Sequence, residues 1–493
     1  MLRRLLRQAK LIGAEDSAIV DREIAGVCSD SRSVKKGDIY VALRGLHHDG
    51  GDFVRQAVAK GAVFAVCERP LSGIDTLVVE NAAAALACLW DAWYGHPTSK
   101  MKLIGITGTN GKTSTAYMLA HILRQTGHIC GLIGTVECSL NDRVLSSRVQ
   151  DPLANMTTPD PAQLYRLLAE MRQGGAEYAV MEVTSHALAL SKVAPLRFYR
   201  ALFTNLTPDH LDFHGDMESY FLEKRKLFSQ CDGAVIATRS AYGERLADGL
   251  DLPLWRVDDR TVTDPVLSGA DGVKFVLHPP IGSPLPVEMG VPGEFSVENG
   301  ALAAMTAVSV GVPSVEVKRS LSSFVGVRGR MERISPSDFC ATVFVDYAHT
   351  PDALEKLLRT ARGFCGEAHR VTVLFGCGGD RDKSKRSRMG QIASSLADFV
   401  IVTSDNCRTE RAKDILRDIL KGVDKEKPYK VIEDRKEAVE FAIRTARQGD
   451  VILLAGKGHE EYEIKGSERL DFSERRIVAA AIAARREREK GAD

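Results

Sequence analysis

The chain has 493 residues, too many for one hydrophobic core, and a usual domain size of about 150 residues predicts roughly three domains. Its 66 basic and 65 acidic side chains leave a net charge of +1, so nucleic acid is not an expected partner. The ten cysteines show no paired CxxC or Cys/His ligand spacing, and we expect reduced thiols rather than a disulfide framework or a zinc ribbon.

The N-terminus, MLRRLLRQAK, carries four basic residues and no uninterrupted apolar region of the kind found in signal peptides. No later stretch reaches the length of about 18 apolar residues that a membrane span needs. We therefore expect a cytoplasmic protein with no membrane insertion.

Proline and glycine interruptions divide the predicted strands and helices into a first, a middle and a last block, which cover 1–97, 98–327 and 328–493. The middle block begins with a buried strand at 102–107, a glycine-rich loop and a helix from about 113 to 124. The strand pattern then recurs, with helical intervals, at 178–183, 201–205 and 234–237. This alternation predicts a mostly parallel α/β sheet.

The last block contains a second α/β series. Short apolar strands are expected at 342–346, 371–375, 399–403 and 451–454. Amphipathic helices are expected between them, for example at 411–421 and 435–447. Because ligands of open α/β sheets bind beyond the carboxyl ends of the strands, residues directly after each strand are the first candidates for a site.

A glycine-rich loop follows the first strand of the middle block and reads Gly108-Thr109-Asn110-Gly111-Lys112-Thr113-Ser114. Between a strand and a helix, its backbone N–H groups can surround phosphate oxygens. Lys112 would add positive charge, and the Thr113 hydroxyl would reach Mg²⁺. The strict pattern requires glycine where this chain has Ile106, so we interpret the loop as a shortened ATP-binding variant; the alternative is a glycine-rich turn without a ligand.

Acidic and histidine side chains follow two later strands of the middle block. Glu182 stands near the end of one strand, where a magnesium-binding acid would stand. Farther along, Asp209-His210-Leu-Asp212-Phe-His214 precedes a helix predicted over 217–228, which contains Lys224 and Lys226. These residue types suit a metal site. A surface glutamate and a solvated His/Asp loop remain open as alternatives at this point.

Seven segments carry a resemblance to a known family, in the order TGTNGKTS, MEVTSHAL, FTNLTPDHLDFHGDMESYFLEK, GRMER, DYAHTPD, GCGGDRDKSKR and GKGHEEYE. Together they resemble the Mur ligases of bacterial cell-wall synthesis, and the resemblance covers all three blocks. The resemblance implies three α/β domains: an N-terminal UDP-sugar-binding domain, a central ATP-binding domain with a parallel sheet, and a C-terminal Rossmann-like domain that binds an amino acid.

Within that family the chain most resembles the members that add the third residue of the peptide. The resemblance implies ATP-dependent joining of meso-2,6-diaminopimelate to UDP-N-acetylmuramoyl-L-alanyl-D-glutamate through an acyl phosphate. It also implies ATP as cosubstrate and a pair of Mg²⁺ ions. We expect small-molecule substrates and a monomer.

The catalytic residues that the resemblance implies are Lys112, Glu182, His210 and Lys224. Of these, Glu182 and His210 would bind Mg²⁺ together with Thr113 and with Lys224 as a carbamate (N6-carboxylysine). The assignment of Lys224 depends on the spacing Tyr220-x-x-x-Lys224. Lys226 should face elsewhere, because neighbours on one helix face recur every three or four residues.

Other implied contacts lie in all three blocks. Nucleotide contacts beyond the loop would be Asn299, Arg330 and Asp346, and Ser296 stands where the family usually has Asn. UDP-sugar contacts would be Ser31, Leu46, His47, His48, Thr157, Thr158, Thr184 and Lys192. Lys192 stands where Arg is common; it can neutralise a phosphate but loses the bidentate geometry.

The amino-acid acceptor would be bound by Arg381, Asp405, Asn406, Cys407, Arg408, Gly456 and Glu460. Arg408 can form a bidentate pair with the distal carboxylate that diaminopimelate has and lysine lacks. Cys407 replaces the usual proline and should loosen this loop. A surface ion pair is the alternative role for Arg408.

Three other functions stay open. A lysine-adding Mur ligase would not need Arg408, because lysine has no distal carboxylate for it to bind. Folylpolyglutamate synthase shares a related loop and a two-domain core, but the first block and the segment 405–408 argue against it. A nucleotide-binding regulator that has lost ligation is disfavoured by the set Lys112, Glu182, His210 and Lys224.

Overall fold

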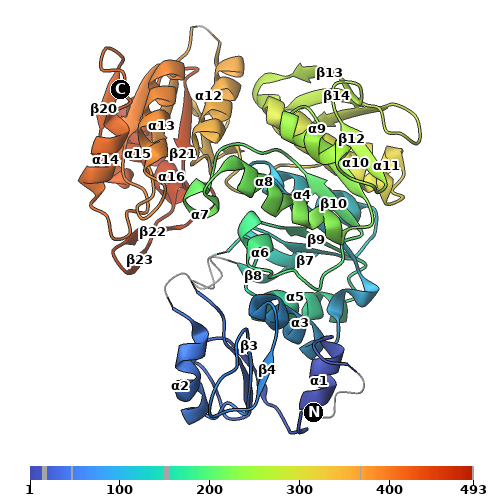
Figure 1. The fold of residues 1–493 in the computed structure, drawn as a ribbon. Helices are drawn as coiled ribbons and strands as arrows, with labels where there is room; N and C mark the ends of the chain where they lie inside the picture. Colours follow the sequence, from blue (N-terminus) through green and yellow to red (C-terminus); the bar gives the residue numbers. More distant parts are fainter. Residues whose placement is uncertain (14–18, 46–47, 148–155, 367, 491–493) are drawn as a thin grey trace.

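A computed structural model describes residues 1–13, 19–45, 48–147, 156–366 and 368–490, and its elements follow one another in the three predicted blocks (Figure 1). Two predicted contacts, Leu46 and His47, lie outside these ranges. In the described part of the chain, no helix is long and apolar enough to cross a membrane. All ten cysteines lie in the described ranges and are free thiols.

The first block forms a four-stranded parallel sheet in the order β1-β2-β3-β4. Its strands are β1 (Gly26–Cys28), β2 (Asp38–Val41), β3 (Phe64–Cys67) and β4 (Thr76–Val78), and its helices are α1 (Leu2–Gln8), α2 (Val54–Ala59) and α3 (Ala82–Trp93). Apolar residues of α1 and α3 pack on the sheet. The side chain of Asn81 caps α3 by accepting a hydrogen bond from the Ala84 N–H.

The middle block is built on an eight-stranded sheet in the order β12-β11-β10-β5-β9-β6-β7-β8. The strands are β5 (Lys102–Thr107), β6 (Cys130–Ile133), β7 (Glu137–Leu140), β8 (Arg143–Ser147), β9 (Tyr178–Glu182), β10 (Arg200–Phe203), β11 (Ala234–Ala237) and β12 (Leu254–Val257). The strands predicted at 102–107, 178–183, 201–205 and 234–237 are confirmed as β5, β9, β10 and β11. Only β7 runs antiparallel to its two neighbours, β6 and β8, and the sequence pattern does not predict β7 or β8.

Helices cover both faces of this sheet. They are α4 (Lys112–Gln125), α5 (Pro161–Gln173), α6 (Ser185–Ala189), α7 (Leu211–His214), α8 (Met217–Arg225), α9 (Ala241–Asp248), α10 (Glu294–Ser309) and α11 (Ser314–Ser322). One face packs on α4 and α10, and the other on α5 and α8. The helix predicted over 217–228 ends as an α-helix at Arg225 and continues as a short 3-10 helix, Lys226–Gln230.

A three-stranded antiparallel sheet completes the middle block, beside α10 and α11 (Figure 1). It consists of β13 (Val262–Leu267), β14 (Val273–Leu277) and β15 (Leu285–Met289). Buried residues alternate with more exposed ones along β14 and β15, because only one sheet face packs on the helices. The sequence pattern does not predict this sheet.

The last block forms a six-stranded sheet in the order β16-β17-β21-β18-β19-β20, in which only β16 runs antiparallel. The strands are β16 (Glu332–Arg333), β17 (Thr342–Asp346), β18 (Val371–Phe375), β19 (Phe399–Val402), β20 (Tyr429–Val431) and β21 (Val451–Ala455), followed by the hairpin β22 (Tyr462–Lys465) and β23 (Glu468–Asp471). The four strands predicted in this block are confirmed as β17, β18, β19 and β21.

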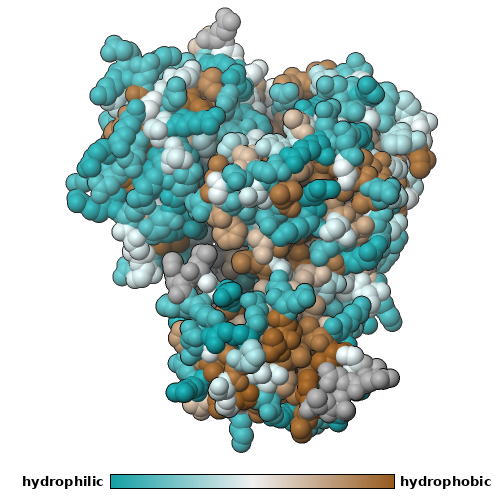
Figure 2. All heavy atoms as spheres, in the orientation of Figure 1, coloured by the Kyte–Doolittle hydropathy of each residue, from teal (hydrophilic) through white to brown (hydrophobic). Residues whose placement is uncertain are grey.

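One face of this last sheet is covered by α12 (Pro351–Cys365), α13 (Ser384–Leu396) and α14 (Ala412–Leu420). The other face is covered by α15 (Arg435–Arg444) and α16 (Glu474–Lys490). In the view of Figure 2 the surface of the last block is largely hydrophilic, whereas apolar side chains gather over part of the first block. The limits between blocks, near 97 and 327, stay predictions.

Candidate active site

The phosphate loop joins the end of β5 to the start of α4. Two of its glycines have positive φ, +147° at Gly108 and +86° at Gly111. A Cβ atom at Gly108 would collide with the Thr204 hydroxyl, and one at Gly111 would collide with the Asn299 side chain. Only glycine therefore fits these two positions, because both the backbone angle and the close neighbours exclude a side chain.

Lys112 folds back over the phosphate loop. Its Nζ atom donates to the carbonyl oxygens of Gly108 and Thr109, both at 2.8 Å. Burial lowers the pKa of Lys112, and the charges of Glu182 and Asp209 oppose that shift. A bound phosphate would offer this amine anionic acceptors beside the two carbonyl groups.

Glu182 is fully buried at the end of β9, so the surface alternative is wrong. Its Oε1 atom accepts from the Thr135 N–H at 2.7 Å. Its Oε2 atom accepts from the hydroxyl groups of Thr113 and Thr135, each at 2.9 Å. The carboxylate is therefore fixed beside the first turn of α4, where it is hydrogen-bonded to Thr113 of the phosphate loop.

Lys224 reaches the same loop from α8. It is buried, and its Nζ atom donates to the Gly108 carbonyl at 2.9 Å and lies 4.6 Å from the centre of the Tyr220 ring. Burial, reinforced by the charge of Lys112, holds the pKa of Lys224 well below its usual range. Lys226 is exposed and pairs with Glu223 at 2.7 Å, which confirms that it faces elsewhere.

His210 stands at the start of α7 in a left-handed conformation, with φ of +54°. Its Nε2 atom lies 3.4 Å from a carboxylate oxygen of Asp209, and its ring centre lies 4.9 Å from that of His186. The His210 side chain is 47% exposed; partial desolvation lowers its pKa, while Asp209 partly offsets that shift. In the part of the chain that the structure describes, no three His, Cys, Asp or Glu side chains form a metal-binding cluster.

A cavity of about 410 Å³ lies between the phosphate loop and the last block. Its apolar walls come from three elements: Leu267 at β13, Phe295 on α10 and Phe364 on α12. Asn299, on α10, lines it and accepts a hydrogen bond from the Thr115 hydroxyl at 3.3 Å. The cavity is thus a mixed apolar and polar slot that opens onto the phosphate loop.

Arg330 and Asp346 of the last block, both expected as nucleotide contacts, line this cavity. Arg330 donates to the Thr113 hydroxyl at 3.2 Å and lies over the Tyr347 ring at 4.7 Å. Asp346 accepts backbone N–H groups of Met331 at 2.7 Å and Ala348 at 2.8 Å, so its carboxylate orders the rim of the cavity. Burial raises the pKa of Asp346, and Arg330 opposes the shift.

Further residues of this site were missed as individual candidates. The Asn110 side chain donates to Asp352 of α12 at 2.7 Å, and its backbone N–H donates to Asn205 Oδ1 at 3.0 Å. Both partners lie inside the family segments named above: Asn205 follows β10, and Asp352 stands at the start of α12. Their positions after a strand and at a helix start could have identified them as site candidates. Thr135, which binds Glu182, lies outside those motifs.

The predicted UDP-sugar residues of the middle block adjoin the buried glutamate. The Thr158 hydroxyl donates to the Glu182 carbonyl at 2.9 Å and accepts from the Thr184 N–H at 3.0 Å. The Thr157 hydroxyl accepts from that of Thr135 at 3.1 Å. These hydroxyl groups form one connected network beside the phosphate loop.

Three further predicted UDP-sugar residues that the structure describes, Lys192, Ser31 and His48, already have contacts within the protein. Buried Lys192 pairs with Asp160 at 2.7 Å. In the first block, the Ser31 hydroxyl donates to Gln56 Oε1 at 2.7 Å, and the His48 ring packs edge-on against Phe53. A ligand at these positions would have to compete with or extend these contacts.

The predicted acceptor residues gather where β18, β19 and β21 end. Buried Lys457 donates to Asn406 Oδ1 at 2.9 Å and pairs with Asp405 at 3.1 Å. Asn406 in turn donates to Glu460 Oε2 at 2.8 Å. Gly456 packs against Asp405, and a Cβ atom there would approach its carboxylate closely. The segment 405–408, which we call the acceptor loop, is therefore tied to the segment after β21.

Arg408 has a left-handed backbone, with φ of +51°. Its Nη1 atom donates to the carbonyl oxygens of Gly379 at 2.9 Å and Asn406 at 3.3 Å. No carboxylate of the described residues lies within ion-pair distance of it, so the surface ion pair is not found. Cys407 is buried and its thiol donates to the Asp405 carbonyl at 3.3 Å. Arg381 is exposed in the adjacent loop.

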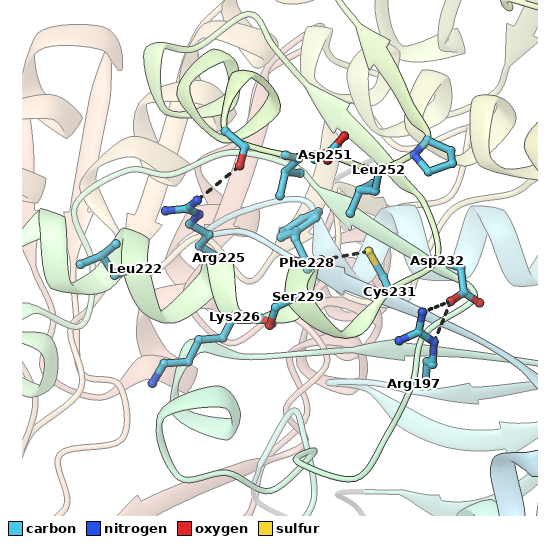
Figure 3. A pocket seen from close by; sticks show the side chains of 13 residues that line it. Arg197, Leu222, Arg225, Lys226, Phe228, Ser229, Cys231, Asp232, Asp251 and Leu252 are labelled. Atoms are coloured by element: carbon cyan, nitrogen blue, oxygen red, sulfur yellow. Dashed lines mark hydrogen bonds and ion pairs between the residues drawn. The ribbon is translucent and has the colours of Figure 1, made fainter.

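A second hollow, of about 730 Å³, lies between α8 and the segment 249–253 (Figure 3). None of the predicted site residues lines it. Arg197 pairs with Asp232 at 2.7 Å, and Arg225 donates to the Gly249 carbonyl at 3.3 Å. The cations of this hollow are thus turned toward the protein's own acceptors.

The fold and the site define a nucleotide-binding enzyme in which a phosphate loop faces a second α/β sheet across a cavity. Family models match three parts of the chain: Mur ligase family, catalytic domain (23–87), Mur ligase middle domain (106–308), and Mur ligase, glutamate ligase domain (329–458). The chain belongs to the Mur ligase family.

Known relatives agree with this assignment. The UDP-N-acetylmuramoyl-L-alanyl-D-glutamate--2,6-diaminopimelate ligase of Caldanaerobacter subterraneus subsp. tengcongensis is 41% identical over 94% of this chain and 95% of its own. A solved structure of a ligase with the same name is 29% identical, with a TM-score of 0.66, over 95% of this chain and 97% of that one. Mycobacterium tuberculosis folylpolyglutamate synthase, 20% identical with a TM-score of 0.61 over 74% of this chain and 91% of its own, shares the fold alone.

Proposed function

We propose that this protein uses ATP to join meso-2,6-diaminopimelate to UDP-N-acetylmuramoyl-L-alanyl-D-glutamate during synthesis of peptidoglycan precursors. Near full-length similarity to ligases of that name supports the proposal. The observation that carries the choice of acceptor is Arg408, a cation held by two carbonyl groups with no carboxylate partner among the described residues. The ATP-dependent reaction is assigned to the cytoplasm, and a monomer is the expected state.

ATP would occupy the cavity between the phosphate loop and the last block. The apolar walls, Leu267, Phe295 and Phe364, suit a purine ring. The backbone N–H groups of the loop and the amine of Lys112 would surround the phosphates. Arg330 would approach the nucleotide from the last block, since its side chain already reaches Thr113 of the phosphate loop.

In the reaction, the D-glutamyl carboxylate attacks the γ-phosphate of ATP, which gives an acyl phosphate and ADP. The amine of diaminopimelate then attacks the acyl carbon and displaces phosphate. Lys112 and the loop amides stabilise charge on the transferring phosphoryl group, which is the main task of a protein in this chemistry. No nucleophile of the protein is required.

The residues beside the phosphate loop fit the magnesium that this proposal includes. The fixed carboxylate of Glu182 and the hydroxyl of Thr113 offer oxygen atoms, which Mg²⁺ prefers. Lys224, buried with its amine on the Gly108 carbonyl, is placed to become a carbamate anion on the same side of the loop. His210 would contribute a nitrogen. When bound, Mg²⁺ would neutralise charge on the phosphates.

Diaminopimelate would be held in the acceptor loop. Its distal carboxylate would pair with Arg408 in the bidentate geometry that guanidinium groups favour. Lysine has no carboxylate at that end and would leave the cation unpaired, so discrimination should be large. Asp405, Asn406, Glu460 and the neighbouring Arg381 supply polar groups for the other ends of the acceptor.

The UDP-sugar substrate would extend from the middle block to the first block. Thr157, Thr158 and Thr184 lie beside Glu182, so they can hold the end of the substrate that reacts. Lys192 would neutralise phosphate charge after exchanging its pairing with Asp160. Ser31 and the segment 46–48 would contact the uridine end.

The test measures phosphate release with ATP, Mg²⁺ and UDP-N-acetylmuramoyl-L-alanyl-D-glutamate, and supplies diaminopimelate, lysine or neither. We expect release with diaminopimelate to exceed release with lysine by about 100-fold or more. Arg408→Ala should lose most of this preference, whereas Arg411→Ala, which removes a nearby exposed arginine, should keep it.

Two results would overturn the proposal. Faster release with lysine would identify a lysine-adding enzyme and remove the argument from Arg408. Tight ATP binding without phosphate release in the presence of either acceptor would identify a regulator that does not ligate.

A further inference from the structure

Arg435 is a fully buried cation at the start of α15, on the opposite side of the sheet from α12 to α14. Its Nε atom donates to Glu474 at 2.9 Å. Glu474 begins the C-terminal helix α16 and its side chain is 2% exposed. A buried ion pair of this kind adds little to stability over a well-packed apolar pair, so stability alone does not account for it.

The two other guanidinium nitrogens of Arg435 bind the chain directly behind the acceptor loop. Nη1 donates to the Ser404 carbonyl at 3.2 Å, and Nη2 donates to the Ala455 carbonyl at 2.8 Å. Ser404 immediately precedes Asp405, and Ala455 immediately precedes Gly456. One side chain therefore joins the two segments that carry most of the proposed acceptor residues.

The strands that Arg435 joins are not neighbours. In the sheet order β17-β21-β18-β19, β18 lies between β21 and β19. No direct ladder of backbone hydrogen bonds therefore sets the spacing between the ends of β19 and β21. The planar, rigid fork of a guanidinium can set that spacing, because its donors point in fixed directions.

The charge of Arg435 also reaches the acceptor loop. Although burial opposes it, the charges of Lys457 and Arg435 hold the pKa of Asp405 below its usual range. Asp405 thus stays ionised, so it can accept hydrogen bonds from an ammonium group of a ligand. Arg435 supplies part of this field from behind the sheet.

We propose that Arg435, oriented by Glu474 of α16, is a positioning residue for the amino-acid acceptor: it fixes the acceptor loop and the segment after β21 relative to each other. The inference rests on the proposed function for the identity of the acceptor. Arg435 itself does not touch the substrate.

The test compares Arg435→Gln and Arg435→Lys with the wild-type enzyme in the phosphate-release assay, with whichever of diaminopimelate and lysine the wild type uses faster. Arg435→Gln should raise the KM for the acceptor about tenfold or more and change the KM for ATP by less than about twofold. Arg435→Lys keeps the charge but loses the fork, so it should raise the acceptor KM about threefold or more.

Arg370→Gln is the matched control. Arg370 pairs with Asp450 at 2.8 Å and donates to the Thr445 carbonyl at 2.9 Å, at the amino ends of β18 and β21, opposite the ends that carry the acceptor residues. This variant should lower the melting temperature while its acceptor KM stays within about twofold of the wild-type value. A purely structural role for Arg435 would make its variants behave in the same way.

An unchanged acceptor KM in a folded Arg435→Gln protein overturns the inference and leaves the proposed function intact. If Arg435→Gln does not fold, an unchanged acceptor KM in Arg435→Lys has the same meaning. If the wild-type enzyme releases phosphate with neither acceptor, the proposed function fails and the inference fails with it. A rise in the KM for ATP equal to that for the acceptor also contradicts it.

Discussion

Two lysines two positions apart, one in the last turn of α8 and the other at the start of the 3-10 helix that follows, have opposite environments. Lys224 is buried against the phosphate loop and donates to the Gly108 carbonyl at 2.9 Å, whereas Lys226 is exposed and pairs with Glu223. Burying an amine without a carboxylate partner is costly, and such a residue is more common at functional sites than elsewhere. This contrast supports a chemical role for Lys224, and Lys226 is a matched control for substitutions of Lys224.

At the residue scale, we predict that Lys224→Ala lowers kcat about 100-fold or more, because the variant lacks the proposed carbamate beside the transferring phosphate. The matched variant Lys226→Ala should keep near wild-type activity. Removing dissolved carbon dioxide should slow the wild-type enzyme, and bicarbonate should restore it. A Lys224→Ala protein with substantial activity that is insensitive to bicarbonate would exclude the carbamate.

At the scale of elements, a buried arginine on α13 joins the loop between β18 and α13 to α14 and to the segment just before α14. Arg386, 1% exposed, pairs with Glu410 at 2.8 Å and with Asp418 at 3.1 Å. It also donates to the Gly378 carbonyl at 3.4 Å, close to Arg408. The carboxyl ends of β18 and β19 are therefore held together by charge as well as by their ladder.

This connection predicts an acid-sensitive contribution to stability. Hydrogen bonding to Arg386 lowers the pKa of Glu410 from 4.5 to about 2. Because the folded-state value is the lower one, the contribution is complete above about pH 4.5 and is lost as the pH falls toward 2. Glu410→Gln should lower the free energy of unfolding by roughly 1–3 kcal/mol at pH 7, and the difference from wild type should shrink below pH 4.5.

Denaturant unfolding at several pH values measures this effect. Glu355→Gln is the control, because Glu355 pairs with Arg359 on the exposed face of α12 and its loss should cost less than about 0.5 kcal/mol. A difference between Glu410→Gln and wild type that is the same at pH 7 and pH 3 would contradict the role of the Glu410 charge.

At the scale of the whole molecule, the last block is closed onto the phosphate loop in this structure. Asn110 donates to Asp352 at 2.7 Å, and Arg330 donates to Thr113 at 3.2 Å. Both contacts join residues of the middle block to residues of the last block. Since both loop residues are proposed to lie at the nucleotide, ATP binding and domain closure should depend on each other.

We therefore predict that Asp352→Ala raises the KM for ATP about fivefold, because it removes a charge-assisted hydrogen bond of the closed arrangement. Small-angle scattering with ATP and Mg²⁺ present should give a larger radius of gyration for Asp352→Ala than for the wild type. Glu355→Ala, one turn farther along α12, should change neither quantity. An unchanged scattering profile and ATP KM in Asp352→Ala would mean that this contact does not hold the closed state.

The sequence by itself determined the features that depend on local pattern. Strands such as β5, β11, β17 and β18 follow from short buried apolar runs, and the phosphate loop follows from glycine spacing between a strand and a helix. The antiparallel sheet β13–β15 was missed because β13 is largely exposed, and because charged or proline residues interrupt the apolar residues of β14 and β15, so neither strand is a continuous apolar run.

Only the tertiary structure decided which distant residues meet. It placed Thr135 on Glu182, Asp352 on Asn110, and Arg435 behind the acceptor loop. The residues of the first contact are 47 positions apart and those of the second 242, so no local spacing specifies these contacts. They depend on strand order and on how two sheets face each other, which local hydrogen bonding and hydrophobic periodicity leave undetermined.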